Sequence, residues 1–361
     1  MAEIRLEGVA HSYDGGKTYA LNPITMTWQD GKAYALLGPS GCGKTTLLNI
    51  ISGLLKPSEG KVFIDGKDVT NVITDDRNIA QVFQFPVLYD TMSVRKNLEF
   101  PLKNRKVPRA KIAERVNEIA ELLGIENDLD SKPSKLRSDL QQIVSLGRGL
   151  VREDVSAILF DEPLTVIDQN FKWTLRNRLK RLHIATGVTV VYVTHDQTEA
   201  LTFADEVLVM NKGSLVQAGT SESLFLEPKH EFVGYFIGSP GMNFLDVEAS
   251  SSVLSHNGKV IGKAAKAGLN GKFRFGVRPE FLIPSNKSGI EFQVERIEDR
   301  GVFKLVHLSR DDFKFIAKTA ESYEAKVGGK VNFSFDPART FVYDENQKAV
   351  STVSPSGAGG N

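Results

Sequence analysis

One stretch constrains the fold of this 361-residue chain more than any other: Gly38-Pro39-Ser40-Gly41-Cys42-Gly43-Lys44-Thr45-Thr46. The apolar residues 33–37 precede it, and the largely apolar residues 47–51 follow it. A short apolar run bounded by a glycine-rich turn is typical of a buried strand, and the residues after the turn favour a helix. The sequence therefore predicts a strand, a glycine-rich loop and a helix in succession.

The spacing Gly-x4-Gly-Lys-Thr in this loop is typical of loops that hold the phosphates of a nucleoside triphosphate. Glycines let backbone N–H groups approach phosphate oxygens, and the following helix offers the positive end of its dipole. On this hypothesis Lys44 holds the β and γ phosphates, and the hydroxyl of Thr45 binds Mg²⁺. The candidate nucleotide-binding residues of the loop are Gly38, Ser40, Gly41, Cys42, Gly43, Lys44, Thr45 and Thr46.

Length and composition limit the remaining possibilities. The length is typical of about two domains. Lysine and arginine together number 45 against 44 aspartates and glutamates, so bulk charge gives no support for nucleic-acid binding. With Cys42 as its single cysteine the chain cannot form an intrachain disulfide, and its amino terminus lacks the apolar core of a secretion signal. Because the apolar runs are strand-sized, we expect membrane association only through a partner protein.

Polar residues stand at the ends of three further predicted strands: Gln84, the pair Asp161 and Glu162, and His195. Ligands of open α/β sheets bind at the carboxyl ends of the strands. There Asp161 is expected to hold Mg²⁺ through water, and Glu162 to orient an attacking water and accept its proton. A lone histidine is more often a packing or surface residue, but its position at a strand end favours a contact between His195 and the γ-phosphate.

Tyr13 and Cys42 each admit two interpretations. Tyr13 precedes a turn and is expected to stack on adenine; the alternative is a half-exposed strand aromatic. Cys42 lies beside Lys44 and near a predicted helix N-terminus, both of which favour a reactive thiolate that ATP would protect. The alternative is that Cys42 is simply a small residue that fits the loop.

The spacing of apolar residues divides the chain into regions with helical and with strand-like patterns. Helical spacing dominates residues from about 88 to 150, inside an α/β domain. Short alternating strands separated by turns begin near residue 240, which predicts a β barrel or sandwich. The expected domains are 1–238 and 239–353, and the small polar residues 354–361 are expected to form a disordered tail.

The motifs together resemble the ATPase subunits of ABC transporters, in the family's order. The matching residues are 38–45 (Walker A), Gln84 (Q-loop), 157–163 (Walker B), Asp168 (D-loop) and 193–196 (H-loop). Residues 219–244 and 276–280 are similar to the maltose-type and glycerol-phosphate-type carbohydrate importers, and residues 85–90 and 100–102 are similar to the glycerol importers. The resemblance implies an ABC-type P-loop NTPase domain followed by an OB/MOP-like all-β domain for regulation or dimerisation.

The resemblance also implies roles and partners. ATP and Mg²⁺ would be the cofactors, with Tyr13 stacking on adenine and Asp168 near the nucleotide. Gln84 would sense the metal and the attacking water, and residues 85–94 would receive the coupling helix of the permease. Two transmembrane permease subunits and, indirectly, a periplasmic or extracellular substrate-binding protein are implied, with no nucleic acid. The chain would lie peripherally at the cytoplasmic face of the inner membrane and energise import of a small carbohydrate or polyol, with glycerol favoured.

One motif departs from the family. Where the family has Leu-Ser-Gly-Gly-Gln, this chain has Leu136-Arg137-Ser138-Asp139-Leu140. In the family this signature reaches the γ-phosphate held by the other subunit of a head-to-tail dimer; a carboxylate and the loss of both glycines should weaken that contact. We therefore expect an asymmetric pair with a second ATPase that has an intact signature. The alternatives are a homodimer that tolerates the change, and a mainly regulatory subunit with reduced turnover.

Overall fold

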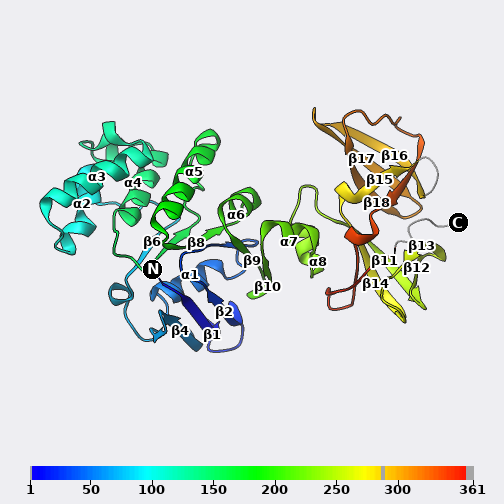
Figure 1. Ribbon diagram of the computed structural model, residues 1–361, viewed down its shortest axis with the longest axis horizontal. Helices are drawn as coiled ribbons and strands as arrows, with labels where there is room; N and C mark the ends of the chain where they lie inside the picture. Colours follow the sequence, from blue (N-terminus) through cyan, green and yellow to red (C-terminus); the bar gives the residue numbers. More distant parts are fainter. Residues whose placement is uncertain (1, 286–288, 355–361) are drawn as a thin grey trace. The chain divides into compact units, whose positions relative to one another are not determined.

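The computed structural model describes residues 2–285 and 289–354 and divides the chain into two compact units, Met1–Ser221 and Glu222–Asn361 (Figure 1). Within the described ranges, no helix combines the length and the apolar character that a membrane crossing requires. Of the expected tail, residues 354–361, only Ser354 belongs to the described part of the chain.

The first unit contains two β-sheets with a helix between them. One sheet is antiparallel, in the order β2-β1-β4-β5, and the other has the order β10-β9-β3-β8-β7-β6. Helix α1 (Lys44–Ser52) follows the glycine-rich loop and shares one apolar core with strands of both sheets. The strands are β1 (Ile4–His11), β2 (Leu21–Trp28), β3 (Ala33–Leu37), β4 (Glu59–Ile64), β5 (Lys67–Asp68), β6 (Ile79–Val82), β7 (Ala157–Asp161), β8 (Thr189–Thr194), β9 (Glu206–Asn211) and β10 (Ser214–Gly219).

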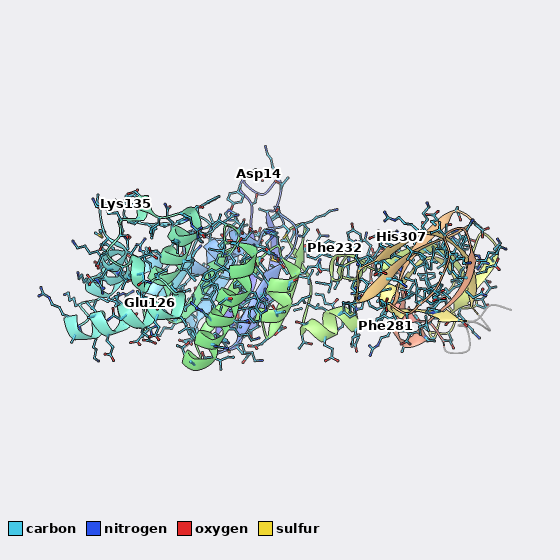
Figure 2. All side chains as sticks on the ribbon, turned by 90° about the horizontal axis from the view of Figure 1, so that it is seen from above. Asp14, Glu126, Lys135, Phe232, Phe281 and His307 are labelled. Carbon is cyan, nitrogen blue, oxygen red and sulfur yellow. The ribbon has the colours of Figure 1, made fainter. Side chains whose placement is uncertain are left out.

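The predicted helical region shares a second core of the first unit with strands β6, β7 and β8 of the larger sheet. Its helices are α2 (Val94–Asn104), α3 (Arg109–Leu123) and α4 (Ser138–Leu150), with the short turns η2 (Glu126–Asp128) and η3 (Pro133–Lys135), where Figure 2 labels Glu126 and Lys135. The predicted helical repeat of Ile112, Val116 and Ile119 is buried in this core. Gly124, with φ +73°, ends α3, a backbone conformation that glycine adopts without strain. Three more helices, η1 (Thr74–Arg77), α5 (Gln169–Thr186) and α6 (Gln197–Phe203), complete the helices described in this unit.

Parallel pairing brings the polar strand ends to one edge of the larger sheet. Strand β3 pairs in parallel with β8, with Leu37 opposite Thr194, and β7 pairs in parallel with β8, with Asp161 opposite Val193. Strand β6 pairs in parallel with β7 and ends at Val82. Because all these strands run in one direction, the residues that follow them leave the sheet on the same side.

The second unit is built from two antiparallel sheets that share one core. The sheet orders are β13-β12-β11-β14-β20-β21 and β15-β19-β16-β17-β18. The predicted all-β character is confirmed, and buried residues of both sheets, such as Phe275 and Phe333, meet in one cluster. The elements are α7 (Ser221–Leu226), α8 (Glu231–Phe236), β11 (Asn243–Ser250), β12 (Val253–His256), β13 (Lys259–Lys263), β14 (Gly271–Val277), η4 (Pro279–Phe281), β15 (Leu282–Ser285), β16 (Ile290–Asp299), β17 (Phe303–Arg310), β18 (Phe313–Ala320), β19 (Lys330–Phe335), η5 (Pro337–Arg339), β20 (Thr340–Tyr343) and β21 (Ala349–Thr352).

Helices α7 and α8 belong to the second unit, which therefore begins at Glu222 and not at the expected residue 239. The reason is Arg278, which is 1% exposed and lies over the ring of Phe225, 4.3 Å from its centroid. Its guanidinium donates to the backbone carbonyls of Phe225 (2.7 Å), Gly234 (3.2 Å), Leu224 (3.5 Å) and Ile237. Phe281, labelled in Figure 2, packs edge-on against Phe225. Burial lowers the pKa of Arg278 to about 10.

Replacing Arg278 by methionine should loosen α7 and α8. The change leaves carbonyls of both helices without their donor, and each buried polar group left unpaired costs about 1–3 kcal/mol. Amide hydrogen exchange in residues 222–237 should accelerate at least ten-fold, with residues 33–52 unaffected. The matched control is Arg296→Met, because the Arg296 side chain is 63% exposed. Equal protection in both variants would contradict this role of Arg278.

Candidate nucleotide-binding and hydrolysis site

The glycine-rich loop connects β3 to α1 and points its lysine inward. Lys44 is 5% exposed, and its Nζ donates to the carbonyls of Gly38 (2.8 Å) and Pro39 (3.0 Å). These are neutral acceptors, so the ammonium charge is not balanced by a carboxylate in this set of contacts. A buried cation beside a helix N-terminus is suited to bind a phosphate, which would offer stronger, charged acceptors.

The loop passes so close to neighbouring backbone that two of its glycines cannot carry a side chain. A Cβ at Gly38 would lie 2.3 Å from the carbonyl oxygen of Met210, and one at Gly43 would lie 2.6 Å from that of Ala20. Gly43 also has φ +97°, which favours glycine. The neighbouring backbone therefore requires glycine at these two positions, so packing by itself accounts for this part of the motif.

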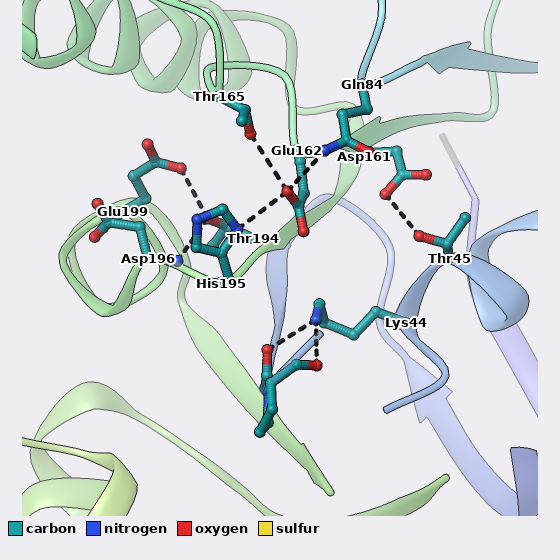
Figure 3. A network of polar contacts seen from close by, with 12 residues as sticks. Lys44, Thr45, Gln84, Asp161, Glu162, Thr165, Thr194, His195, Asp196 and Glu199 are labelled. Carbon is teal, nitrogen blue, oxygen red and sulfur yellow. Dashed lines mark hydrogen bonds and ion pairs between the residues drawn. The ribbon is translucent and has the colours of Figure 1, made fainter. Parts of the chain in front are cut away.

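Asp161, at the end of β7, reaches across to the start of α1. The hydroxyl of Thr45 donates to Asp161 Oδ1 over 3.1 Å, as Figure 3 shows. Burial raises the pKa of Asp161, and the neighbouring charge of Glu162 adds to the rise. A raised carboxyl pKa means that the site would be stabilised by an added cation. The hydroxyl and carboxylate oxygens are ligands suited to Mg²⁺.

Three donors from three different segments meet at Glu162. Its Oε2 accepts from Gln84 Nε2 (3.2 Å) and from Thr165 Oγ1 (3.3 Å), and it lies 3.0 Å from His195 Nδ1. Gln84 follows β6, Thr165 follows β7 and His195 follows β8 (Figure 3). The structure thus brings together the predicted residues Gln84, Glu162 and His195. Thr165, three positions after Glu162, was not predicted; its hydroxyl type and spacing were the available signal.

A buried carboxylate supports the turn that carries His195. Glu199, on α6, is 4% exposed and its Oε2 accepts from Thr194 Oγ1 (2.9 Å) and from Tyr192 OH (3.1 Å). The same Thr194 oxygen accepts from the backbone N–H of Asp196 over 3.0 Å. Both neighbours of His195 in the chain are therefore held. Sequence reasoning missed Glu199, because nothing in its residue type showed that it would be buried.

The remaining predicted residues lie near this edge of the sheet with different surroundings. Tyr13 is 67% exposed, and its hydroxyl lies 3.2 Å from Thr46 Oγ1, so the ring stands beside the loop with a free surface. Asp168 is exposed and directly precedes α5, where its carbonyl accepts from the N–H groups of Phe171 and Lys172. The role of each in nucleotide binding stays a prediction.

The structure favours the second of the two interpretations of Cys42, a small residue that fits the loop. The residue is 4% exposed, and burial raises the pKa of its thiol even though Lys44 Nζ lies 3.9 Å from the sulfur. Desolvation outweighs the nearby cation because a thiolate loses its water of hydration here. Cys42 is the small packing residue of the alternative interpretation.

Thiol–disulfide exchange between Cys42 and Ellman's reagent should therefore be slow in the folded protein. Since its pKa is raised, the thiolate fraction near pH 7 is below that of an ordinary cysteine, and the rate should rise only at more alkaline pH. With Cys42 as the only cysteine, release of thionitrobenzoate from Ellman's reagent reports this site alone. We expect a rate at least about a hundred-fold below that of the denatured chain. Rapid modification of the folded protein at pH 7 would contradict the burial.

Residues 136–140, which differ from the family's signature motif, lie at the start of α4. Arg137 precedes the helix and donates to Asp139 Oδ2 over 2.9 Å, and the backbone N–H of Leu140 donates to Asp139 Oδ1 over 2.9 Å. Leu136 is partly buried against the helical core, and Ser138 is the first residue of the helix. A carboxylate of the chain itself thus occupies the end of α4 where an anion would otherwise find backbone donors.

Comparisons with known proteins agree with this geometry. A family profile described as ABC transporter matches residues 21–165. The trehalose/maltose import ATP-binding protein of Thermococcus litoralis is 38% identical, over 96% of this chain and 98% of its own length. The sn-glycerol-3-phosphate import ATP-binding protein of Jannaschia sp. is 37% identical, over 96% of this chain and 99% of its own length.

This chain belongs to the family of ABC transporter ATP-binding proteins. Part of an ABC transporter complex from Clostridium perfringens has a similar structure, with a TM-score of 0.57 and 29% identity over 62% of this chain and 90% of that chain. A dimeric ATP-binding cassette bound to ADP and Pi in a post-hydrolysis state matches with a TM-score of 0.56 and 30% identity, over 60% of this chain and 98% of the cassette. The chain is an ATP-binding ATPase of an ABC-type transporter.

Proposed function

We propose that this ABC ATPase energises an importer of a small carbohydrate or polyol, with glycerol as the favoured substrate. The observation that supports hydrolysis most directly is the meeting of Lys44, Asp161, Glu162 and His195 along one edge of the parallel sheet. The import direction and the substrate class rest on relatives named for trehalose/maltose and sn-glycerol-3-phosphate import. The preference for glycerol rests on the similarity of the sequence of residues 85–90 to that of the glycerol importers.

The surroundings of each site residue support a particular role in ATP hydrolysis. Lys44 exchanges its neutral carbonyl partners for the β and γ phosphates of ATP. Glu162 orients the attacking water and takes its proton, while His195 and Gln84 hold that carboxylate and face the terminal phosphate. Tyr13, exposed beside the loop, stacks on the adenine ring.

The side chains of Thr45 and its neighbours are suited to bind Mg²⁺. Asp161 and Thr45 would hold it, and Gln84 would approach it; the ion supplies positive charge against the phosphate oxygens. Among the residues that the structure describes, no group of three or more histidine, cysteine or acidic side chains is arranged to bind a metal. This is consistent with Mg²⁺, which usually takes one or two protein ligands together with water and phosphate oxygens.

Residues 85–89 are suited to contact a permease. Phe85, Val87 and Tyr89 are 68%, 50% and 42% exposed, an unusual apolar group on a surface. The backbone beneath them is held, because Asn97, fully buried, accepts from the N–H of Tyr89 and donates to its carbonyl. A rigid apolar segment next to Gln84 can transmit a change at the nucleotide to membrane subunits. The chain would bind to these subunits as a peripheral protein on the cytoplasmic side of the membrane. The substrate-binding protein outside the membrane would act only through those subunits.

We also propose that the chain works as half of an asymmetric ATPase pair. Its own phosphate loop, Glu162 and His195 form one competent site, which a partner with an intact signature completes. The site that this chain's signature completes is weak, because Asp139 uses the N–H of Leu140 and adds a carboxylate near the triphosphate. Arg137 offsets part of that charge. One alternative is a mainly regulatory subunit with slow turnover, which the altered signature favours. The other is a homodimer that tolerates the altered signature.

Glu162→Gln should abolish hydrolysis while leaving nucleotide binding intact. The amide keeps the shape but cannot accept the proton, so ATP turnover of the assembled complex should fall about a hundred-fold or more. Binding of a fluorescent ATP analogue should change less than two-fold. The matched control is Glu126→Gln at an exposed position (Figure 2). Turnover close to that of the wild type in Glu162→Gln would exclude the proposed base.

The double change Ser138→Gly with Asp139→Gly should strengthen the weak site. It frees the N–H of Leu140 and removes a carboxylate, so ATP turnover by the purified chain should rise about ten-fold. Asp130→Gly, at a 94% exposed side chain outside α4, controls for the added flexibility. Unchanged or lower turnover in a folded double variant would count against the asymmetric pair and favour a signature that functions as it stands.

A further inference from the structure

The three contacts at Glu162 all end on the same oxygen. Gln84, Thr165 and His195 approach Oε2 at 3.2, 3.3 and 3.0 Å. Within the described residues, no hydrogen bond to Oε1 is found, and Figure 3 shows this second oxygen directed to the side of the site where Lys44 lies. An oxygen that already accepts several hydrogen bonds has little capacity left for a further proton, whereas the other oxygen keeps its lone pairs.

Thr165 is held to Glu162 by backbone as well as by side chain. Its N–H donates to the carbonyl of Glu162 over 3.3 Å, which closes a turn after β7. Glu162 has φ +47°, an uncommon conformation for a residue with a side chain, and its own N–H donates to Val193 on β8 over 2.9 Å. Strain of this kind persists where the surroundings impose it, and it turns the carboxylate of Glu162 toward the ends of β6 and β8.

We propose that Thr165 is a positioning residue for hydrolysis, which fixes Glu162 Oε2 so that Oε1 is the oxygen that receives the proton of the attacking water. The inference rests on the proposed role of Glu162 as the base. As the water oxygen bonds to the terminal phosphorus and the bond to ADP breaks, one water proton passes to Oε1. Thr165 touches neither the water nor the phosphate.

The hydrogen bond from the Thr165 hydroxyl differs from the other two contacts because it comes from the same turn as Glu162. Gln84 and His195 come from segments after β6 and β8, so their distances to Glu162 depend on how those segments move. Thr165 lies three residues from Glu162 in the same turn and therefore stays with it. Its hydrogen bond limits rotation of the carboxylate when either of the other donors turns to the phosphate or to Mg²⁺.

The test compares Thr165→Val, which keeps the shape and removes the hydroxyl, with Thr165→Ser, which keeps the hydroxyl. In the full chain, assembled with the membrane subunits that co-purify with it, Thr165→Val should lower kcat for ATP about ten-fold, with KM and binding of a non-hydrolysable ATP analogue within two-fold of the wild type. Thr165→Ser should keep at least half of the kcat. The matched control is Thr186→Val, an exposed threonine on α5 whose hydroxyl bonds only to its own helix in the contacts described.

The outcomes separate this inference from the function on which it rests. If Glu162→Gln is inactive and Thr165→Val has the kcat of the wild type, the role of Thr165 is overturned and the base stands. If Glu162→Gln retains turnover, the proposed function itself fails. If Thr165→Val and Thr165→Ser lose kcat equally, or Thr165→Val weakens binding of the analogue as much as it lowers kcat, Thr165 serves the fold alone and the inference is overturned.

Discussion

The site depends on the parallel pairing of four strands. Leu37 lies opposite Thr194, and Asp161 lies opposite Val193, so the residues that follow β3, β7 and β8 emerge within one row at the sheet edge. Hydrogen bonds of a parallel ladder fix this register along the whole strand. A slip of one residue in β7 would send Asp161 to the other face of the sheet. The separation between Lys44 and Glu162, for which we propose phosphate binding and proton acceptance, is therefore set by the register of the sheet.

Charge at this edge is incompletely balanced in the chain alone. Lys44 contacts carbonyl groups, and burial raises the pKa of Asp161 beside Glu162. A nucleotide with its metal would supply the missing counter-charges to both sides at once. On the proposed function, the loop and the carboxylates would each gain a stronger partner from this ligand than they have in the free chain.

At the start of α4, unlike at Lys44 and Asp161, charged side chains of the chain are paired with each other. A helix N-terminus normally leaves backbone N–H groups free for an anion, but here Asp139 uses one of them and is itself paired with Arg137. One N–H donor at the start of this helix is thus taken up by the chain's own carboxylate. This difference between two helix N-termini of one unit is the physical argument for the unequal pair of sites that we propose.

The sequence by itself determined the nucleotide loop, the strand-end residues, the helical region and the all-β region, because glycine spacing, apolar runs and helical repeats are local signals. The family likeness followed from the order of those motifs, and the comparisons confirmed it. Only the tertiary structure decided which groups share an environment. It buried Cys42 and so decided between the two interpretations of that residue. It also joined α7 and α8 to the second unit through Arg278, and it placed Thr165 and Glu199 beside Glu162 and Thr194. The contacts of Arg278 and the burial of Cys42 depend on segments far apart in the chain, which no local pattern records. Thr165 and Glu199 lie within a few residues of their partners, but only the folded turns bring their side chains together.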